Sequence, residues 1–314
     1  MLDRLLRPRN GHAWTVVIAE PQRLRFARGQ VSSDGRPRLQ ACGEAEVRGD
    51  AKSLARAAQQ MHVATSPHCA TLLGSGDYRF MLVEAPSVPR EELRAAMKWR
   101  LKEIIDFPVE EATYDVLELP AADAARVGRP SVYAVVARNG VLKDCVARLD
   151  QAGVRVSVID VPETAQRNLT ALYEEENRGV GLLYIDDEGA LVTVTFRGEL
   201  YGVRRFDVGM RHILDTQGDE REEVFSRILL ELQRTLDSFE RQFSFIVLSK
   251  VMVGPEPEDT GLVAYLRGSL GLRVEPVDLG AVIDTDAGVM LDAPTQWRLF
   301  HAIGGAMRSE ASTG

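Results

Sequence analysis

The side chains best placed for chemistry are two carboxylates that directly follow an apolar run at residues 182–185. Asp186 and Asp187 end this run, and Gly189 follows shortly after. An aspartate at the end of a strand can hold a hydrated magnesium ion, and a neighbouring glycine lets the backbone approach phosphate groups. Here Asp186 and Gly189 are one residue further apart than in an aspartate–x–glycine turn. The sequence therefore indicates a phosphate-binding turn of altered geometry.

If the two halves of the chain held a nucleotide between them, each half would need a turn that faces the phosphates. A second turn of this kind is therefore expected in the first half of the chain. The corresponding segment, VVIAEPQRLRFARG, has Ala19, Glu20 and Pro21 in place of aspartate, spacer and glycine. Proline has no backbone N–H and a fixed φ, so this turn is poorly suited to cradle phosphate.

Other catalytic motifs are missing from the sequence. The five histidines and three cysteines are scattered and form no zinc-binding or nucleophile motif. The phosphate loop GxxxxGK[ST] is missing as well, and the short GSGD at residues 74–77 reads as a hairpin turn. We therefore predict no catalytic residue and no bound metal.

The composition of the chain limits the kinds of partner that it can bind. The 314 residues include 45% hydrophobic and 27% charged side chains, typical of a globular protein, and the net charge is −8. A chain this acidic repels a nucleic-acid backbone. Arg4, Arg7 and Arg9 are too few to anchor the chain to a membrane, and no apolar run reaches the roughly twenty residues that span a bilayer. Membrane attachment is expected only through a partner.

The elements that must position these turns occur in the same order twice. In the first half, short strand-like runs precede an alanine-rich helix and a buried strand, and the second half repeats three strands, helices and a strand.

Between the two repeats lies an amphipathic helix that ends before Pro108. Its apolar face carries Leu93, Met97, Leu101 and Ile104. The strand predictions are residues 14–18, 24–29, 38–44, 68–73, 112–119, 131–137, 154–159, 179–189, 190–200, 201–209, 245–253 and 272–276. The helix predictions are 51–61, 89–105, 141–151, 160–173, 208–216, 219–243, 262–270 and 295–307, the last ending near Gly304 and Gly305.

This duplication predicts an α/β, actin-like fold built from two ribonuclease H-like lobes. The first lobe is expected over residues 1–173, with an inserted subdomain at about 82–137, and the second over residues 174–314.

The chain resembles the PilM family of type IV pilus assembly proteins, and within it the MshI proteins of mannose-sensitive haemagglutinin pilus biogenesis. It is also similar to the cytoplasmic domain of GspL proteins of type II secretion. The segments that carry the resemblance are AMKWRLKEIIDFPVEEATYDVLEL, VSVIDVPETAQRNL, LLYIDDEGALVTVTFRGELYGVRRFDVG, LLELQRTLDSFERQ and RLFHAIGGAMR.

The resemblance implies a non-enzymatic scaffold at the cytoplasmic face of the bacterial inner membrane, which binds a cytoplasmic peptide of a PilN-like bitopic membrane protein within a pilus or secretion motor complex. It also implies that Asp186, Gly189 and Gly254 mark a nucleotide site. That site is degenerate here, because the segment expected to contact adenosine reads VGPEPEDTG and the first phosphate turn is altered. We expect weak or absent binding of ATP and magnesium, and hence no cofactor.

Four side chains are candidates for binding the partner peptide if they are exposed: Trp99, Ile105, Phe107 and Tyr114. Packing of the helix on its own sheet explains them equally well. Two alternatives to the scaffold stay open, an active actin-like ATPase or sugar-kinase relative that uses Asp186 and Gly254, and a self-polymerising actin-like filament.

Overall fold

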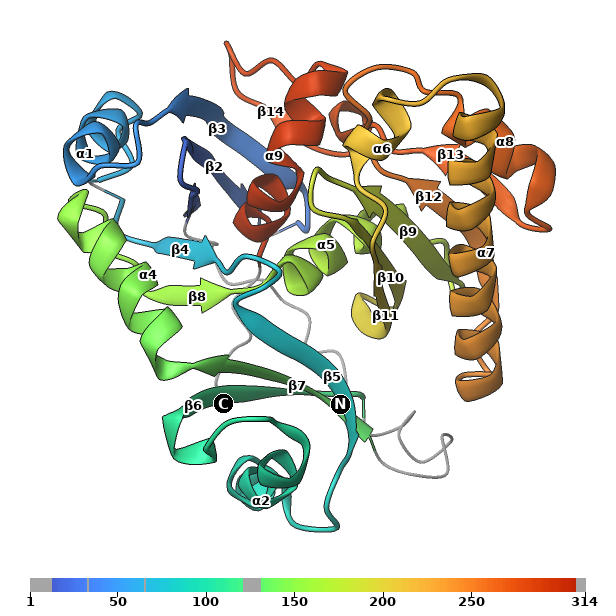
Figure 1. The fold of residues 1–314 in the computed structure, drawn as a ribbon, viewed down its shortest axis with the longest axis horizontal. Helices are drawn as coiled ribbons and strands as arrows, with labels where there is room; N and C mark the ends of the chain where they lie inside the picture. Colours follow the sequence, from blue (N-terminus) through green and yellow to red (C-terminus); the bar gives the residue numbers. More distant parts are fainter. Residues whose placement is uncertain (1–12, 33, 65, 121–130, 309–314) are drawn as a thin grey trace. The chain divides into compact units, whose positions relative to one another are not determined.

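The computed structural model describes residues 13–32, 34–64, 66–120 and 131–308 (Figure 1). Arg4, Arg7 and Arg9 lie outside the described residues. The chain divides into two compact units. The small unit is Leu73–Leu149, and the large unit contains the described residues before and after it, including those on both sides of the lobe boundary predicted at residue 173. The predicted insertion at 82–137 falls within the small unit.

The first sheet of the large unit has the strand order β14-β3-β2-β1-β4-β8. Strands β1, β2 and β3 form an antiparallel meander, while β4 and β8 continue the sheet in parallel with β1. Helix α1 (Ala51–Gln60) begins at Asp50, whose carboxylate accepts a hydrogen bond from the Ser53 amide at 2.8 Å, as a helix N-cap should. The predicted order of three strands, a helix and a strand is confirmed. The strands are β1 (Trp14–Ala19), β2 (Arg23–Val31), β3 (Pro37–Glu46), β4 (Cys69–Leu72), β8 (Val158–Asp160) and β14 (Asp284–Thr285).

The second sheet repeats this arrangement with the order β11-β10-β9-β12-β13. Every residue of β9 and β10 is buried, which explains their nearly continuous apolar sequence. The long helix α7 (Gly218–Gln242) packs its row of Phe225, Ile228, Leu232 and Leu236 against this sheet. The other elements are β9 (Gly179–Ile185), β10 (Ala190–Phe196), β11 (Glu199–Phe206), α6 (Met210–Leu214), β12 (Leu248–Val253), α8 (Leu262–Ser269) and β13 (Arg273–Pro276).

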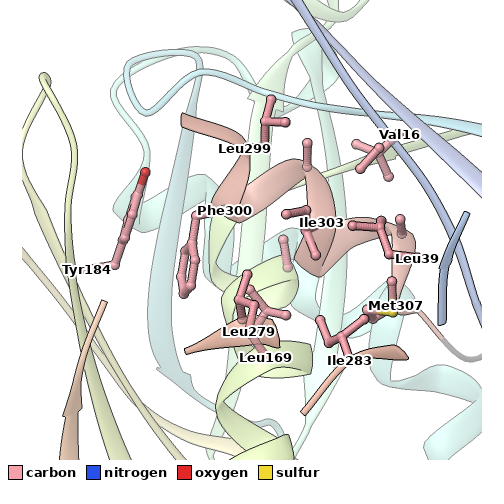
Figure 2. Packing of buried hydrophobic residues seen from close by; sticks show 14 of the residues in the cluster. Val16, Leu39, Leu169, Tyr184, Leu279, Ile283, Leu299, Phe300, Ile303 and Met307 are labelled. Atoms are coloured by element: carbon pink, nitrogen blue, oxygen red, sulfur yellow. The ribbon is translucent and has the colours of Figure 1, made fainter. Parts of the chain in front are cut away.

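Helices α5 (Pro162–Thr170) and α9 (Ala293–Ala306) fill the core between the two sheets (Figure 2). The predicted helix over 295–307, ending near Gly304 and Gly305, is confirmed as α9, and both glycines are buried in its last turn. A Cβ atom on Gly304 would lie 2.3 Å from the Ala165 carbonyl oxygen of α5. The two glycines are therefore needed for close approach of the backbones.

The small unit contains an antiparallel sheet of order β5-β7-β6 with helix α2 (Arg90–Ile104) packed on one face. Leu93, Met97 and Leu101 lie on the buried side of α2, as their spacing predicts. Helix α4 (Asn139–Gln151) follows β7 along the chain. Strand β5 was not predicted. The strands are β5 (Tyr78–Glu84), β6 (Ala112–Glu118) and β7 (Ser131–Arg138).

Within the described ranges, no helix combines the length and the apolar character that crossing a bilayer requires.

Candidate functional site

The two predicted phosphate turns lie at the ends of β1 and β9, and each is closed by its own hydrogen bonds. The Glu20 amide donates to the Arg23 carbonyl at 2.8 Å. In the second turn, one carboxylate oxygen of Asp186 accepts from the amides of Glu188 and Gly189 at 2.8 and 3.0 Å. The extra residue before Gly189 thus folds the backbone around the Asp186 carboxylate, and the amides that phosphate would need are already engaged.

Carboxylates of the second turn act on Glu20 of the first turn. Burial raises the pKa of Glu20, and the nearby charges of Glu188 and Asp186 raise it further against the opposing effect of Arg25. Burial also raises the pKa of Asp186, although its two amide hydrogen bonds and the charge of Arg205 oppose the shift. The position where two actin-like turns would face phosphate therefore has a strongly acidic character.

Two basic side chains of this region, Arg25 and Arg298, are held in ion pairs. Arg25 Nη1 lies 2.7 Å from Glu20 Oε1, and its Nε lies 3.7 Å from Glu44. Glu44 also pairs at 2.6 Å with Arg298 of α9. Arg25 and Arg298 thus neutralise protein carboxylates instead of presenting a pair of cations to a ligand.

Gly254 lies at the end of β12, where its missing side chain makes room for protein atoms. A Cβ atom there would lie 2.8 Å from the Tyr184 ring. Its amide donates to the Leu183 carbonyl at 2.7 Å and so extends the pairing of β12 with β9. Glycine is also favoured by packing at position 189, since a Cβ atom there would lie 3.1 Å from the Phe206 carbonyl oxygen. Both glycines are explained by packing.

Helix α9 closes the same edge of the second sheet. The Tyr184 hydroxyl donates to the Trp297 carbonyl at 2.6 Å, and Trp297 Nε1 donates to the Ile185 carbonyl at 2.9 Å. The Tyr184 ring stacks on Phe300 with centroids 4.4 Å apart (Figure 2). Asp186 and Gly254 thus lie at one edge of the second sheet, and α9 side chains pack directly beside this edge.

A buried polar network lies behind this edge. Glu163, which is fully buried, pairs with Arg205 at 2.9 Å. The amide nitrogen of Gln166 donates to the carbonyls of Leu182 and Leu191 at 3.0 and 3.1 Å, so its oxygen is free to accept from His301 Nε2 at 3.2 Å. Burial lowers the pKa of His301 to about 3. Sequence reasoning missed this network, because spacing alone does not show which polar side chains of α5 point inward.

The four candidate peptide-binding side chains lie in the small unit with different exposures. The expectation of exposure is wrong for Ile105, which is 8% exposed and packs in the apolar cluster under α2, continuing the row of Met97 and Leu101. The guanidinium carbon of Arg138 lies 4.0 Å from the centre of the Phe107 ring. The Tyr114 hydroxyl donates to the Arg94 carbonyl at 3.0 Å. Only Trp99, 72% exposed, is open to solvent among the four.

Among the described residues, no group of three or more histidine, cysteine or acidic side chains is arranged to hold a metal ion.

Comparison with known proteins connects this geometry to solved structures. No family model matches the chain, and no curated protein matches its sequence. The structure of a PilM–PilN type IV pilus biogenesis complex aligns over 94% of this chain and 98% of its own, with a TM-score of 0.72 and 17% identity. A Bacteroides thetaiotaomicron protein with an actin-like ATPase fold and unknown function aligns over 87% and 92%, with a TM-score of 0.52 and 10% identity. The cytoplasmic domain of EpsL, an inner-membrane component of the type II secretion system of Vibrio cholerae, aligns over 96% and 99%, with a TM-score of 0.49 and 14% identity.

The duplicated sheets and the likeness to these structures agree with each other. The predicted resemblance to PilM is confirmed at the level of the fold, which is α/β and actin-like.

Proposed function

We propose that this chain is a non-catalytic scaffold of a type IV pilus or type II secretion assembly complex, at the cytoplasmic face of the bacterial inner membrane. The observation on which this rests is the match to the PilM–PilN complex across nearly the whole of both chains. The scaffold is proposed to hold a cytoplasmic peptide of a PilN-like membrane protein. The MSHA pilus is the system we propose for it, from the sequence resemblance to MshI.

We further propose that the actin-like fold is used here without tight nucleotide binding. The support is chemical, since phosphate brought to the two turns would meet Glu20, Asp186 and Glu188. Burial and the charges of Glu188 and Asp186 raise the pKa of Glu20, and burial and the charge of Glu188 raise the pKa of Asp186. Charges of the same sign repel strongly where burial lowers the local dielectric. The backbone amides and Arg25, which could have offset that repulsion, are bound to protein carboxylates.

Titration calorimetry with magnesium-ATP tests the second part of this proposal. We expect no heat of binding at millimolar nucleotide. Binding in the micromolar range that depends on magnesium would instead support the ATPase alternative. The variant Glu20→Gln/Glu188→Gln sharpens the test, because removal of two negative charges should bring measurable affinity only if repulsion is what excludes phosphate.

Fluorescence anisotropy tests the scaffold itself. Labelled peptides covering the cytoplasmic tails of bitopic pilus and secretion proteins encoded beside this chain are titrated with the protein in the absence of nucleotide and lipid. Saturable binding of one tail, with a scrambled tail as control, is the expected result. If no tail binds at high micromolar protein, the proposed scaffold function is wrong.

A further inference from the structure

Trp99 is placed on the side of α2 that faces solvent. The helix buries Leu93, Met97 and Leu101 against the sheet of the small unit. Trp99 follows Met97 by two residues, which is about 200° of rotation around a helix, so its side chain points away from the sheet. At 72% exposure it leaves most of a large aromatic surface in water, which costs free energy unless another surface covers it.

Basic side chains form a row beside this tryptophan. Arg94, Lys98 and Lys102 are four residues apart, so they lie one above another on the exposed side of the helix. This row carries three positive charges, although the chain as a whole carries a net charge of −8, while the exposed Glu92 and Glu103 lie on the other side of Trp99 at helical spacing. The complete charged set of α2 is five basic residues, Arg90, Arg94, Lys98, Arg100 and Lys102, and three acidic ones, Glu91, Glu92 and Glu103.

The contacts of these basic groups within the protein are few and weak. Arg94 donates to the Tyr114 carbonyl at 3.2 Å, and Lys98 Nζ lies 3.8 Å from Glu110. Arg100 lies 4.0 Å from Glu103. Exposed ion pairs of this kind contribute little to stability and exchange readily for other anions.

We propose that this face of α2, defined by Trp99 with Arg94, Lys98 and Lys102, binds the anionic headgroups of a lipid bilayer. The charges are complementary, since phosphate headgroups are negative and a row of lysine and arginine is attracted to them. Tryptophan is suited to the level of the headgroups, because its ring is apolar while its indole N–H can hydrogen-bond.

A lipid surface fits this face better than a protein partner does. Specific protein interfaces bury roughly 800 Å² on each side and cluster several large apolar side chains at the centre. On α2, by contrast, the only other exposed large apolar side chain is Ile104, which lies at the helix end near the buried row. A single aromatic ring beside Lys98 and Lys102 needs no complementary pocket. Attachment should therefore be weak, reversible and sensitive to salt.

This direct contact differs from the sequence-based expectation that the membrane is reached only through a partner. Each basic residue near an anionic surface should strengthen binding about fivefold, which alone does not hold a protein firmly. Combined with a membrane-anchored partner, however, a weak second contact raises the overall affinity because both sites act together. The lipid contact itself does not rest on the proposed scaffold function.

Tryptophan fluorescence provides the test, because the three tryptophans differ in exposure. Trp14 is 5% exposed, and Trp297 is partly buried with its ring nitrogen bonded to a carbonyl. Quenching by acrylamide should therefore report mainly on Trp99. Vesicles of phosphatidylcholine mixed with phosphatidylglycerol are expected to shift the emission to shorter wavelength and to protect it from acrylamide. Vesicles of phosphatidylcholine alone should do neither, and Trp99→Phe should remove the response.

Two double variants distinguish binding through the α2 face from a general effect of the protein's charge on its attraction to anionic vesicles. Lys98→Ala/Lys102→Ala should weaken sedimentation with the anionic vesicles by more than about tenfold. The control Lys52→Ala/Arg56→Ala removes the same charge at the same spacing from the exposed side of α1 and should change binding less than about threefold. All of these substitutions are at exposed positions, and circular dichroism checks that each variant folds.

Two results would overturn the lipid proposal. One is an unchanged Trp99 emission with anionic vesicles at low salt; the other is an equal loss of binding in the α1 control. Protection of Trp99 by a partner peptide but not by vesicles would assign the face to protein contact. Because no partner peptide is present in the vesicle assay, its outcome is independent of the scaffold test.

Discussion

Helices α9 and α2 contrast in what surrounds them. The C-terminal half of α9 is buried on all sides, from Leu299 to Ala306 apart from the partly buried His301. Helix α2 buries only one row and turns Trp99 and its charged side chains outward. In α9 an apolar residue is explained by packing wherever it occurs. In α2 an apolar residue on the outer side has no such explanation, so Trp99 indicates function and Phe300 does not.

The largest effect should come from the inner row of α2. Met97→Ala is expected to lower the free energy of unfolding by about 3–4 kcal/mol, because the side chain is fully buried and its removal leaves a cavity. Urea denaturation followed by circular dichroism measures the loss, with Lys98→Ala as the neighbouring exposed control. A loss below about 1 kcal/mol would contradict the one-sided packing of this helix.

The next effect concerns the close approach of α9 to α5. Gly304→Ala should cost about 2–3 kcal/mol, because the added methyl would lie 2.3 Å from a backbone oxygen and both helices would have to shift. Gly268→Ala in α8 is the control, since no atom lies within 4 Å of the added methyl and alanine favours helix. We expect that control to be neutral or stabilising in the same urea titration.

The third effect depends on pH. Loss of hydration around the partly buried imidazole lowers the pKa of His301 in the folded state to about 3, below the value near 6.5 of an unfolded histidine. The unfolded chain therefore takes up a proton first, and stability present above pH 6.5 is lost as the pH falls toward 3. Between pH 6.5 and 5 the loss should be about 2 kcal/mol.

His301→Gln isolates this contribution, since glutamine can still donate to Gln166 but does not titrate. Urea unfolding of both proteins at several pH values should show the smaller acid sensitivity in the variant. Parallel loss of stability in the two proteins would mean that His301 is not held neutral.

The smallest effect on stability should come from Trp99. Trp99→Ala is expected to change the free energy of unfolding by less than about 0.5 kcal/mol, because the ring has few contacts to lose. The same variant should nevertheless lose binding to anionic vesicles. A large destabilisation would place Trp99 among the packing residues and remove the contrast with α9.

Most of the fold could be predicted from the sequence, because the repeated order of strands and helices follows from hydrophobic periodicity. What escaped prediction depends on contacts between distant segments. The two-residue strand β14 exists only through its pairing with Arg38 and Leu39. The need for glycine at position 304 follows only from the contact of α9 with α5. Ile105, in contrast, could have been recognised as buried by continuing the four-residue spacing of Met97 and Leu101.

The sequence identifies single residues of the candidate site but not the contacts that surround them. Asp186 and Gly254 do lie at one edge of the second sheet, because parallel strands β9 and β12 end there. The part played by Glu20 was missed, since its effect depends on Glu188 in a different hairpin. Tyr184 and Trp297 were missed for the same reason, as their hydrogen bonds join residues more than a hundred positions apart.

The return of β14 and α9 to the first sheet has a consequence for biosynthesis. Strands β1 to β4 leave the ribosome early, yet their inner face stays uncovered until residues 284–306 have been translated. The first sheet therefore cannot complete its core before these residues have emerged. A ribosome that stops before this point releases a chain with an incomplete core, which proteases can recognise before it occupies a place in any larger assembly.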